Sequence, residues 1–256
     1  MWGDIAIAFL LAFITAFVIT PYSIRWAKKV GAVDYPNDRR VNKKPMPRLG
    51  GIAVIAGFLV SAIYLIITMR IENNIDFITD GLGKKLLGFL FGAMVLGITC
   101  YIDDVKGISP LAKLAGQLIA AIIVVSCGVR IDNFTIPFKE NSIMINEVIS
   151  YILTIGWIVG ITNAINLIDG LDGLSSGITL IACISMLIIF SLNESPLIAI
   201  ILITALAGAI VGFLPYNFNP AKTFIGDVGS NFMGYAISII SILGVAKTYT
   251  AIVIIA

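Results

Sequence analysis

The stretch VISYILTIGWIVGITNAINLIDGLDG, residues 148–173, changes from an apolar run into a polar cluster without a break. Its first part, 148–165, is long enough to cross a bilayer core of about 30 Å as a helix that rises about 1.5 Å per residue. It lacks the alternation of barrel strands, and only helices and closed barrels satisfy their backbone groups in lipid. The stretch therefore predicts a membrane-spanning helix whose polar end lies at the membrane edge.

Comparable apolar runs occur along the whole chain. The composition agrees, because 59% hydrophobic and 12% charged residues with a mean hydropathy of +1.01 exclude a soluble domain with a polar surface. The runs long enough to span a membrane are 5–24, 51–69, 86–102, 111–129, 148–165, 177–192, 196–214 and 232–245, and a last run, 249–256, is too short. We expect an all-α, polytopic transmembrane helical bundle of about nine apolar segments, the last one incomplete.

The chain is expected to be a single domain, 1–256, because no polar linker or internal repeat divides it. Apolar positions alternate on both sides of a polar centre within 130–145, which predicts a small β-hairpin. Lysines and arginines in short loops stay cytoplasmic. Eleven of the 17 lie on the side of the first loop, so that side is predicted to be cytoplasmic and the hairpin to be on the outer face.

Three polar clusters lie on the predicted cytoplasmic side. The first contains Asp103 and Asp104 at the end of a spanning segment, with Lys113 at the start of the next. Adjacent carboxylates repel each other and need water, a cation or a basic partner. Lys113 is suited to hold a phosphate as a point charge. A pair of aspartates that only ends the helix is the alternative interpretation.

The second cluster follows the stretch quoted above. Asn163, Asn166, Asp169 and Asp172 recur at every third position, which on a helix makes a slowly winding polar stripe. Ionisable groups at membrane depth are costly and favour a functional role. A polar contact between helices, joined by the amides, is the alternative.

The third cluster covers residues 217–230. It begins with Asn217 and contains Asp227 between two glycines, directly before another spanning run. The start of that helix favours bound anions through its free N–H groups. Phe224 is suited to stack on a planar base, although an aromatic residue near the interface also serves as a membrane anchor.

Any acid–base or metal chemistry in this chain must use carboxylates. The sequence contains no histidine, and Cys100, Cys127 and Cys183 lie in apolar segments at no metal or disulfide spacing. Hard carboxylate oxygens suit Mg²⁺ or Mn²⁺, and Mg²⁺ usually binds one or two carboxylates together with substrate phosphates. The basic loop 34–51 supplies positive charge beside these carboxylates, or serves only as a topology signal.

Four motifs follow one another along the chain. They are Asp-x-Pro…Pro-x-Pro-Arg-x-Gly-Gly at 34–51, Asp-Asp at 103–104, Asn-x-x-Asn-x-x-Asp-Gly-Leu-Asp-Gly-Leu at 163–174 and Asn-x-x-Pro-Ala-x-x-Phe-x-Gly-Asp-x-Gly-Ser at 217–230. In this order they resemble the motifs of the polyprenyl-phosphate N-acetylhexosamine-1-phosphate transferase family. Together they cover nearly the whole chain. The segment 47–51 is more similar to the WecA/TagO-like branch, which uses UDP-N-acetylglucosamine, than to the related phospho-MurNAc-pentapeptide translocase branch.

The resemblance implies a Mg²⁺-dependent enzyme of the bacterial cytoplasmic (inner) membrane, with an active site that faces the cytoplasm. Such an enzyme transfers a sugar-1-phosphate, in this branch GlcNAc-1-phosphate, from a UDP-sugar to undecaprenyl phosphate and releases UMP. The expected partners are the UDP-sugar, undecaprenyl phosphate and the lipid bilayer, and no nucleic acid is expected. The exact sugar, the downstream polymer, a direct or two-step mechanism, and a monomer or a homodimer stay open.

The resemblance also assigns roles to the site residues. Asp227 would ligate the Mg²⁺ that bridges the pyrophosphate, supported by Asp104. Asp103 and Asp104 would be the catalytic pair, with Asp103 accepting or steering the proton of the lipid phosphate. The lipid phosphate would be held by Lys113 and Arg48. The nucleotide-sugar pocket would be formed by Asn163, Asn166, Asp169, Asp172, Asn217 and Phe224, with Phe224 stacked on the uridine.

The chain departs from the family pattern at one point, and one other class of protein would also explain its polar residues. Related transferases carry a histidine-rich loop beyond the last motif, whereas this chain stops inside an apolar run. We expect the chain to be truncated at the C-terminus; the alternative is that the loop is dispensable in it. Buried carboxylates beside broken helices are also typical of cation- or proton-coupled transporters. The crowding of the polar groups at one face favours the transferase over a transporter, and their spacing favours it over a membrane scaffold.

Overall fold

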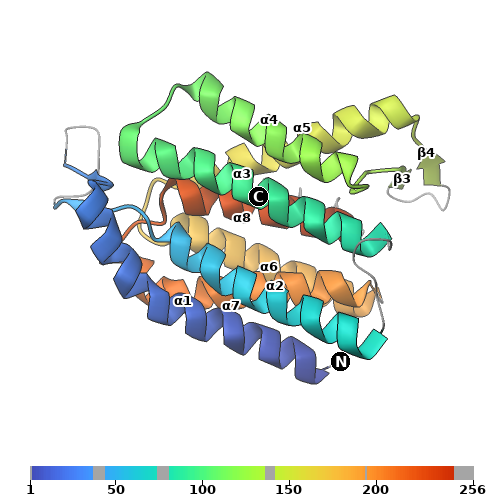
Figure 1. Cartoon of the computed structure of the whole chain (residues 1–256), viewed down its shortest axis with the longest axis horizontal. Helices are drawn as coiled ribbons and strands as arrows, with labels where there is room; N and C mark the ends of the chain where they lie inside the picture. The colour runs from blue at the N-terminus through green and yellow to red at the C-terminus, as the bar shows by residue number, and fades with distance from the viewer. Residues whose placement is uncertain (1, 37–43, 74–80, 136–141, 194, 245–256) are drawn as a thin grey trace.

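The computed structural model describes residues 2–36, 44–73, 81–135, 142–193 and 195–244. Within these ranges the chain is mainly helical, and the helices run back and forth along the long axis of the molecule (Figure 1). They are α1 (Trp2–Val30), α2 (Gly51–Asn73), α3 (Gly81–Lys106), α4 (Pro110–Ser126), α5 (Glu147–Ile168), α6 (Leu174–Leu192), α7 (Leu197–Asn217) and α8 (Gly226–Leu243).

The eight long apolar runs fall into these eight described helices in the same order. Six of the helices, α1, α2, α3, α5, α6 and α7, are long and apolar enough to cross a membrane. The apolar helix α4 has 17 residues, and α8 begins with a polar turn that contains Asp227. The multi-pass helical bundle is confirmed, but nine spanning segments are not, and the run 249–256 lies outside the described residues.

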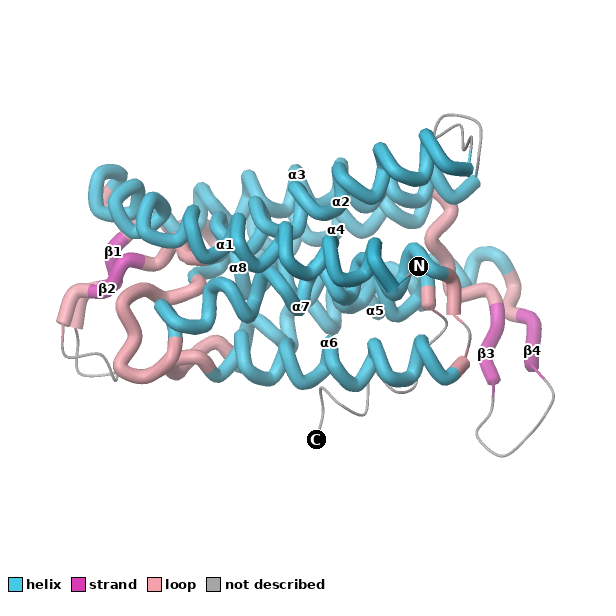
Figure 2. The backbone as a smooth tube through the Cα atoms, turned by 90° about the horizontal axis from the view of Figure 1, so that it is seen from below, coloured by secondary structure: helices cyan, strands magenta, loops and turns pink. Residues whose placement is uncertain are grey.

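The two ends of the bundle differ. At one end, which we call the carboxylate end, α1, α3, α5 and α7 finish and the other four helices begin; the opposite end is the hairpin end (Figure 2). Antiparallel strands β1 (Val33–Asp34) and β2 (Met46–Pro47) lie at the carboxylate end, and β3 (Asn133–Thr135) pairs with β4 (Ser142–Met144) at the hairpin end. The β3–β4 hairpin confirms the prediction for 130–145, whereas β1 and β2 were not predicted.

Helices α7 and α8 form the centre of the bundle. Helix α7 packs against α1, α2 and α6, and α8 packs against α3 and α5. The inner face of α1 consists of small residues, since Ala8, Ala12 and Ala16 are completely buried. Small residues let helix backbones approach closely, which is how helices associate in lipid, where no hydrophobic effect drives them together.

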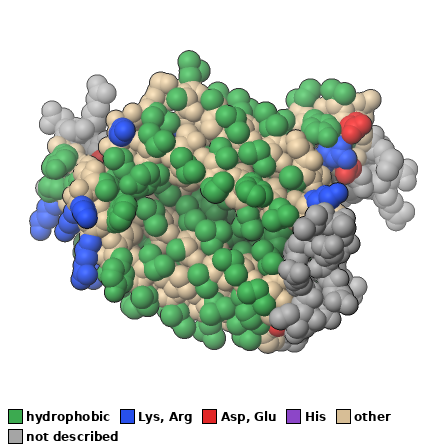
Figure 3. Space-filling model, in the orientation of Figure 1, with side chains coloured by type: hydrophobic (Ala, Val, Ile, Leu, Met, Phe, Trp, Pro, Cys, Tyr) green, Lys and Arg blue, Asp and Glu red, His purple; other side chains and the backbone are tan. Residues whose placement is uncertain are grey.

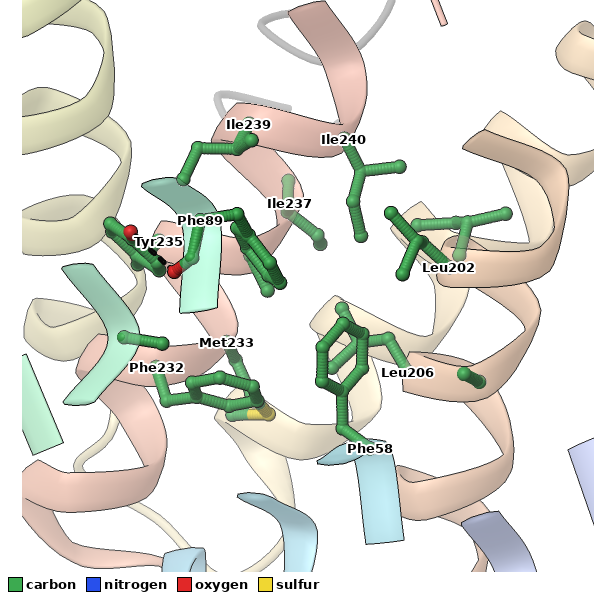
Figure 4. Packing of buried hydrophobic residues seen from close by; sticks show 14 of the residues in the cluster. Phe58, Phe89, Leu202, Leu206, Phe232, Met233, Tyr235, Ile237, Ile239 and Ile240 are labelled. Carbon is green, nitrogen blue, oxygen red and sulfur yellow. Dashed lines mark hydrogen bonds between the residues drawn. The ribbon is translucent and has the colours of Figure 1, made fainter. Parts of the chain in front are cut away.

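Aromatic side chains join α2, α3 and α8 in the core (Figure 4). The ring of Phe58 lies 5.5 Å from that of Phe89 and 5.4 Å from that of Phe232, both edge to face. Phe89 stacks on Tyr235 at 5.5 Å, and the Tyr235 hydroxyl donates a hydrogen bond to the Phe89 carbonyl at 2.9 Å. This packing fixes α3 against α8, the two helices that bring Asp103, Asp104 and Asp227 to the carboxylate end.

The surface matches a protein embedded in a bilayer. Figure 3 shows hydrophobic side chains across the middle of one face and lysines and arginines gathered toward both ends. Large apolar side chains such as Phe91, Ile98 and Ile122 are exposed. An apolar belt between two charged ends is typical of transmembrane proteins.

Candidate active site

A pocket of about 1000 Å³ opens at the carboxylate end. Its walls come from the first loop, the end of α3, the end of α5 with the turn that follows, and the segment that leads into α8. Seven predicted site residues line it: Arg48, Asp104, Asn166, Asp169, Asp172, Phe224 and Asp227. The other four, Asp103, Lys113, Asn163 and Asn217, are not part of the lining. The structure therefore brings the three polar clusters and the first loop to one place.

Lys113 joins the clusters just behind the wall of the pocket. Its ammonium group donates to Asp227 Oδ1 and, at 3.1 Å, to Asn166 Oδ1, and it lies 3.3 Å from Asp103 Oδ2. Ser109 places this lysine, because its side chain caps α4 by accepting from the Ala112 N–H. We call Asp103, Lys113, Asn166 and Asp227 the lysine cluster; they come from α3, α4, α5 and α8.

The carboxylate of Asp227 is fixed but open to the pocket. The Asn166 amide donates to Asp227 Oδ1 at 2.7 Å and to Ser230 Oγ at 2.9 Å. The side chain of Asp227 stays 25% exposed and lines the pocket. Asp103 is fixed as well, since its Oδ1 accepts from the Ile108 N–H at 2.9 Å. Two carboxylates are thus held in place around one ammonium group.

Asp104 caps helix α8, a role that the sequence did not indicate. Its two carboxylate oxygens accept hydrogen bonds from the N–H groups of Asp227 and Val228, at 3.1 and 2.9 Å, so it caps the start of α8. Only 1% of Asp104 is exposed. The Arg48 Nη2 donates to the Asp104 carbonyl at 2.8 Å, and Arg48 Nε lies 3.5 Å from Asp104 Oδ1. Asp104 positions Asp227, and its role beside a metal stays a prediction.

Two glycines permit this arrangement. Gly226 has φ of 72°, and a Cβ there would lie 1.9 Å from the Arg48 carbonyl oxygen and 2.8 Å from Asp104 Oδ2. A Cβ on Gly51 would lie 2.2 Å from the backbone of Gly229 in α8. Both positions therefore require glycine, for left-handed backbone and close approach at Gly226 and for close approach at Gly51.

The first loop is joined to the third cluster through the backbone. The N–H groups of Gly50 and Gly51 donate to the carbonyls of Phe224 and Ile225, at 3.0 and 2.8 Å, and the Phe224 N–H donates to the Pro47 carbonyl at 2.8 Å. This pairing places Arg48 and Phe224 on neighbouring parts of the pocket wall. The spacing of the first motif therefore has a structural reason besides any chemistry of its side chains.

Asn163 takes part in a chain of amides that sequence reasoning missed. Its Nδ2 donates to Gln117 Oε1 at 2.7 Å, the Gln117 Nε2 donates to Asn231 Oδ1 at 2.8 Å, and the Asn231 Nδ2 donates to the Asp227 carbonyl at 2.8 Å. Gln117 and Asn231 are buried. Gln117 stands four positions after Lys113, on the same face of α4, and a polar residue at that place was the available signal.

The remaining predicted residues hold the loops around the pocket. Asp172 Oδ2 accepts from the Asn219 side chain at 3.2 Å and the Ala221 N–H at 3.0 Å. Asn217 is buried, accepting from Ser176 Oγ at 2.8 Å and donating to the Thr223 carbonyl at 3.1 Å. Their contacts are with the protein, and direct contact with a nucleotide stays a prediction.

Asp169 follows the last residue of α5 and lines the pocket. Burial raises the pKa of its carboxyl group to about 6, although the Ser175 hydroxyl, which donates to Asp169 Oδ1 at 2.6 Å, opposes this shift. The negative charge of Asp227 contributes to the rise. Asp169 therefore changes its charge near pH 6.

The pocket lining is anionic among the residues that the structure describes. Five carboxylates, from Asp34, Asp104, Asp169, Asp172 and Asp227, face two basic side chains, from Lys44 and Arg48. Asp34, Lys44 and Met46 were not predicted to line the site. Within the described part of the chain, no three Asp, Glu, His or Cys residues are close enough to hold a metal by themselves. The oxygen donors fit Mg²⁺ only together with ligands from a substrate, the usual mode for this ion.

The fold and the pocket define a multi-pass membrane protein with a carboxylate-lined site at one end of its bundle. A family model described as glycosyl transferase family 4 matches residues 86–245. The chain is 42% identical, over 96% of its length, to a protein of Bacillus subtilis named probable undecaprenyl-phosphate N-acetylglucosaminyl 1-phosphate transferase. It is 36% identical, over 87% of its length, to decaprenyl-phosphate N-acetylglucosaminephosphotransferase of Mycobacterium tuberculosis.

A third relative belongs to the other branch. The chain is 34% identical, over 93% of its length, to phospho-N-acetylmuramoyl-pentapeptide-transferase of Staphylococcus epidermidis, of which it covers 74%. It spans 64% of the Bacillus protein and 56% of the Mycobacterium protein. The chain belongs to glycosyl transferase family 4.

Proposed function

We propose that this protein transfers N-acetylglucosamine-1-phosphate from UDP-N-acetylglucosamine to undecaprenyl phosphate and releases UMP. The observation that carries the proposal is the lysine cluster, in which residues from α3, α4, α5 and α8 meet beside an anionic pocket at one end of a membrane-embedded bundle. The higher identity to the transferases named for N-acetylglucosamine supports this sugar over MurNAc-pentapeptide.

The proposed reaction is a phosphoryl transfer. An oxygen of the lipid phosphate attacks the phosphorus that carries the sugar, the phosphoanhydride bond to the uridine-bearing phosphorus breaks, and UMP leaves with the electron pair. Mg²⁺, held by Asp227 and the donor pyrophosphate, would neutralise their negative charge. A monoalkyl phosphate is largely ionised near neutral pH, with a second pKa of about 6, so strong base catalysis is not required.

The residues of the chain then position the reactants. Lys113 and Arg48 bring positive charge to the lipid phosphate, and Asp103, beside Lys113, accepts or steers its remaining proton. Phe224 and Asn166 line the pocket for the nucleotide-sugar, with the uridine stacked on Phe224. Asp104 holds α8 so that Asp227 faces the pocket.

The proposed location is the bacterial cytoplasmic (inner) membrane, with the carboxylate end in the cytoplasm. Basic side chains are exposed around that end, on Arg25, Lys28, Lys29, Lys106 and Lys222, and basic residues in short loops stay cytoplasmic. The nucleotide-sugar is dissolved on that side. Clustering at one end also argues against a transporter, whose ion sites lie near the midplane of the bilayer.

The test is UMP release by the purified full chain in lipid nanodiscs. We expect release with UDP-N-acetylglucosamine, Mg²⁺ and undecaprenyl phosphate, and none when any one of them is left out. UDP-N-acetylgalactosamine and UDP-MurNAc-pentapeptide serve as competing donors, and preference for either would correct the sugar. Uptake of a cation into sealed vesicles without UMP release would replace the transferase by a transporter.

A further inference from the structure

The Lys113 ammonium group is surrounded by side-chain oxygens of the kind that a divalent cation also binds. An ammonium group has three donors and no acceptor. The Lys113 ammonium faces three oxygens, Oδ1 of Asp227, Oδ1 of Asn166 at 3.1 Å and Oδ2 of Asp103 at 3.3 Å. These oxygens come from three different helices, and the side chains of Lys113 and Asp103 are only 16% and 14% exposed. The lysine is therefore fully coordinated by oxygen.

A divalent cation that binds Asp227 through Oδ1 would use an oxygen that the ammonium group already contacts. Like charges a few ångströms apart repel each other strongly where water is largely excluded. The ammonium group and the cation therefore compete for Asp227. Lys113 has a flexible four-carbon stem, whereas Asp227 is held at the start of α8 by Asp104. Of the two partners, the lysine is the one that can move away.

We propose that Lys113 acts as an exchangeable counter-ion of Asp227, released from this carboxylate when a divalent cation binds and then available to the phosphate of the lipid substrate. This inference rests on the proposed function, because it requires a cation site at Asp227. In the resting protein the lysine contacts the carboxylates of Asp103 and Asp227 and holds them in place. Its release links the arrival of the metal to the binding of the second, anionic substrate.

The proposed exchange predicts that one substitution, Lys113→Met, strengthens metal binding but lowers turnover. Lys113→Met keeps the length of the side chain and removes its charge. It is expected to raise the affinity for Mn²⁺ in the presence of the nucleotide-sugar about tenfold, because the competing ammonium group is gone. The same variant is expected to lose turnover at least 100-fold. A lysine that only supports the fold, or that holds the metal through the substrate, does not tighten metal binding when it is removed.

The experiment measures Mn²⁺ binding by electron paramagnetic resonance on the full chain in nanodiscs, with UDP-N-acetylglucosamine present and undecaprenyl phosphate left out. Lys113→Arg keeps a cation and is expected to bind Mn²⁺ within about twofold of the unchanged protein. Lys106→Met removes an exposed charge at the same end and is expected to stay within about twofold as well. Thermal unfolding of each variant shows whether it is folded.

The outcomes separate the two proposals. If Asp227→Asn binds Mn²⁺ as well as the unchanged protein does, the metal site of the proposed function is wrong. If that site exists but Lys113→Met leaves its affinity unchanged or weaker, the exchange is wrong while the metal site stands. Tighter binding in Lys113→Met, with Lys113→Arg unchanged, supports the exchange.

Discussion

The two ends of the bundle carry the same kinds of charged side chains in opposite surroundings. At the hairpin end, Arg130 Nη1 donates to Glu147 at 2.8 Å and Arg130 Nε lies 3.9 Å from Asp132, and the two carboxylate side chains are 72% and 63% exposed. At the carboxylate end, Lys113 faces Asp103 and Asp227, which are largely shielded from water. One cation serves two carboxylates in both places.

The two ends differ in how far the charged side chains are exposed to water. Exposed pairs are solvated and contribute little to stability, typically up to about 1 kcal/mol. Partly buried pairs lose part of their hydration, so they persist in a membrane protein mainly where a function requires them. Each end has one basic side chain between two carboxylates, but only the arrangement at the carboxylate end therefore predicts a functional site.

The largest expected effect concerns turnover. Asp227→Asn removes the charge of a carboxylate that faces the pocket, and we expect UMP release to fall about 100- to 1000-fold, because charge neutralisation dominates phosphoryl transfer. Arg130→Gln breaks both ion pairs at the hairpin end and is expected to leave turnover within about twofold. Comparable losses in both variants would contradict the functional distinction between the ends.

The next effect concerns stability. Asp104→Asn replaces a carboxylate oxygen, which accepts a backbone N–H at the start of α8, by an amide group that donates. We expect the free energy of unfolding to fall by about 1–3 kcal/mol, the cost of a buried donor without a partner. Glu147→Gln should change it by less than about 1 kcal/mol. Denaturant titration in detergent measures both, and an unaffected Asp104→Asn would show that the cap is dispensable.

A smaller effect is expected from the amide chain. Gln117→Leu removes the hydrogen bonds that join Gln117 to Asn163 and Asn231, and it loosens the contact of α4 with α5 and α8. We expect turnover to fall about tenfold, with stability lower by about 1–2 kcal/mol. Gln117→Glu retains the acceptor for Asn163 and should lose less turnover. Normal turnover of the leucine variant would show that the chain does not position Lys113 and Asp227.

The smallest effect is a dependence on pH. The pKa of Asp169 is about 6 in the folded protein, above the ordinary value of 3.8, so its protonated form favours folding. This contribution to stability is complete below about pH 3.8 and is lost as the pH rises through 6. Asp169→Asn should therefore match the unchanged protein near pH 4 and melt slightly higher at pH 7.5. A gap in melting temperature that is independent of pH would refute the assignment.

The sequence predicted the helices better than the contacts of the site. Apolar runs have the length of a bilayer, and so the eight described helices were found. The β3–β4 hairpin was found from the alternation of apolar positions within 130–145. The alternating direction of the helices then brought the three clusters to one end. The capping by Asp104 and the chain through Gln117 depend on which helices touch, which spacing along one segment does not contain. The same applies to β1 and β2, which are two residues long and exist through pairing.

The pairing of Gly50 and Gly51 with Phe224 and Ile225 has a consequence for biogenesis. Residues 47–51 leave the ribosome long before 223–225, so the pocket wall that contains Arg48 cannot close until α7 has been inserted and α8 has followed. A nascent chain arrested before residue 223 therefore holds its first loop without those carbonyl partners. The binding pocket is therefore completed only after residues 223–225 have been synthesised.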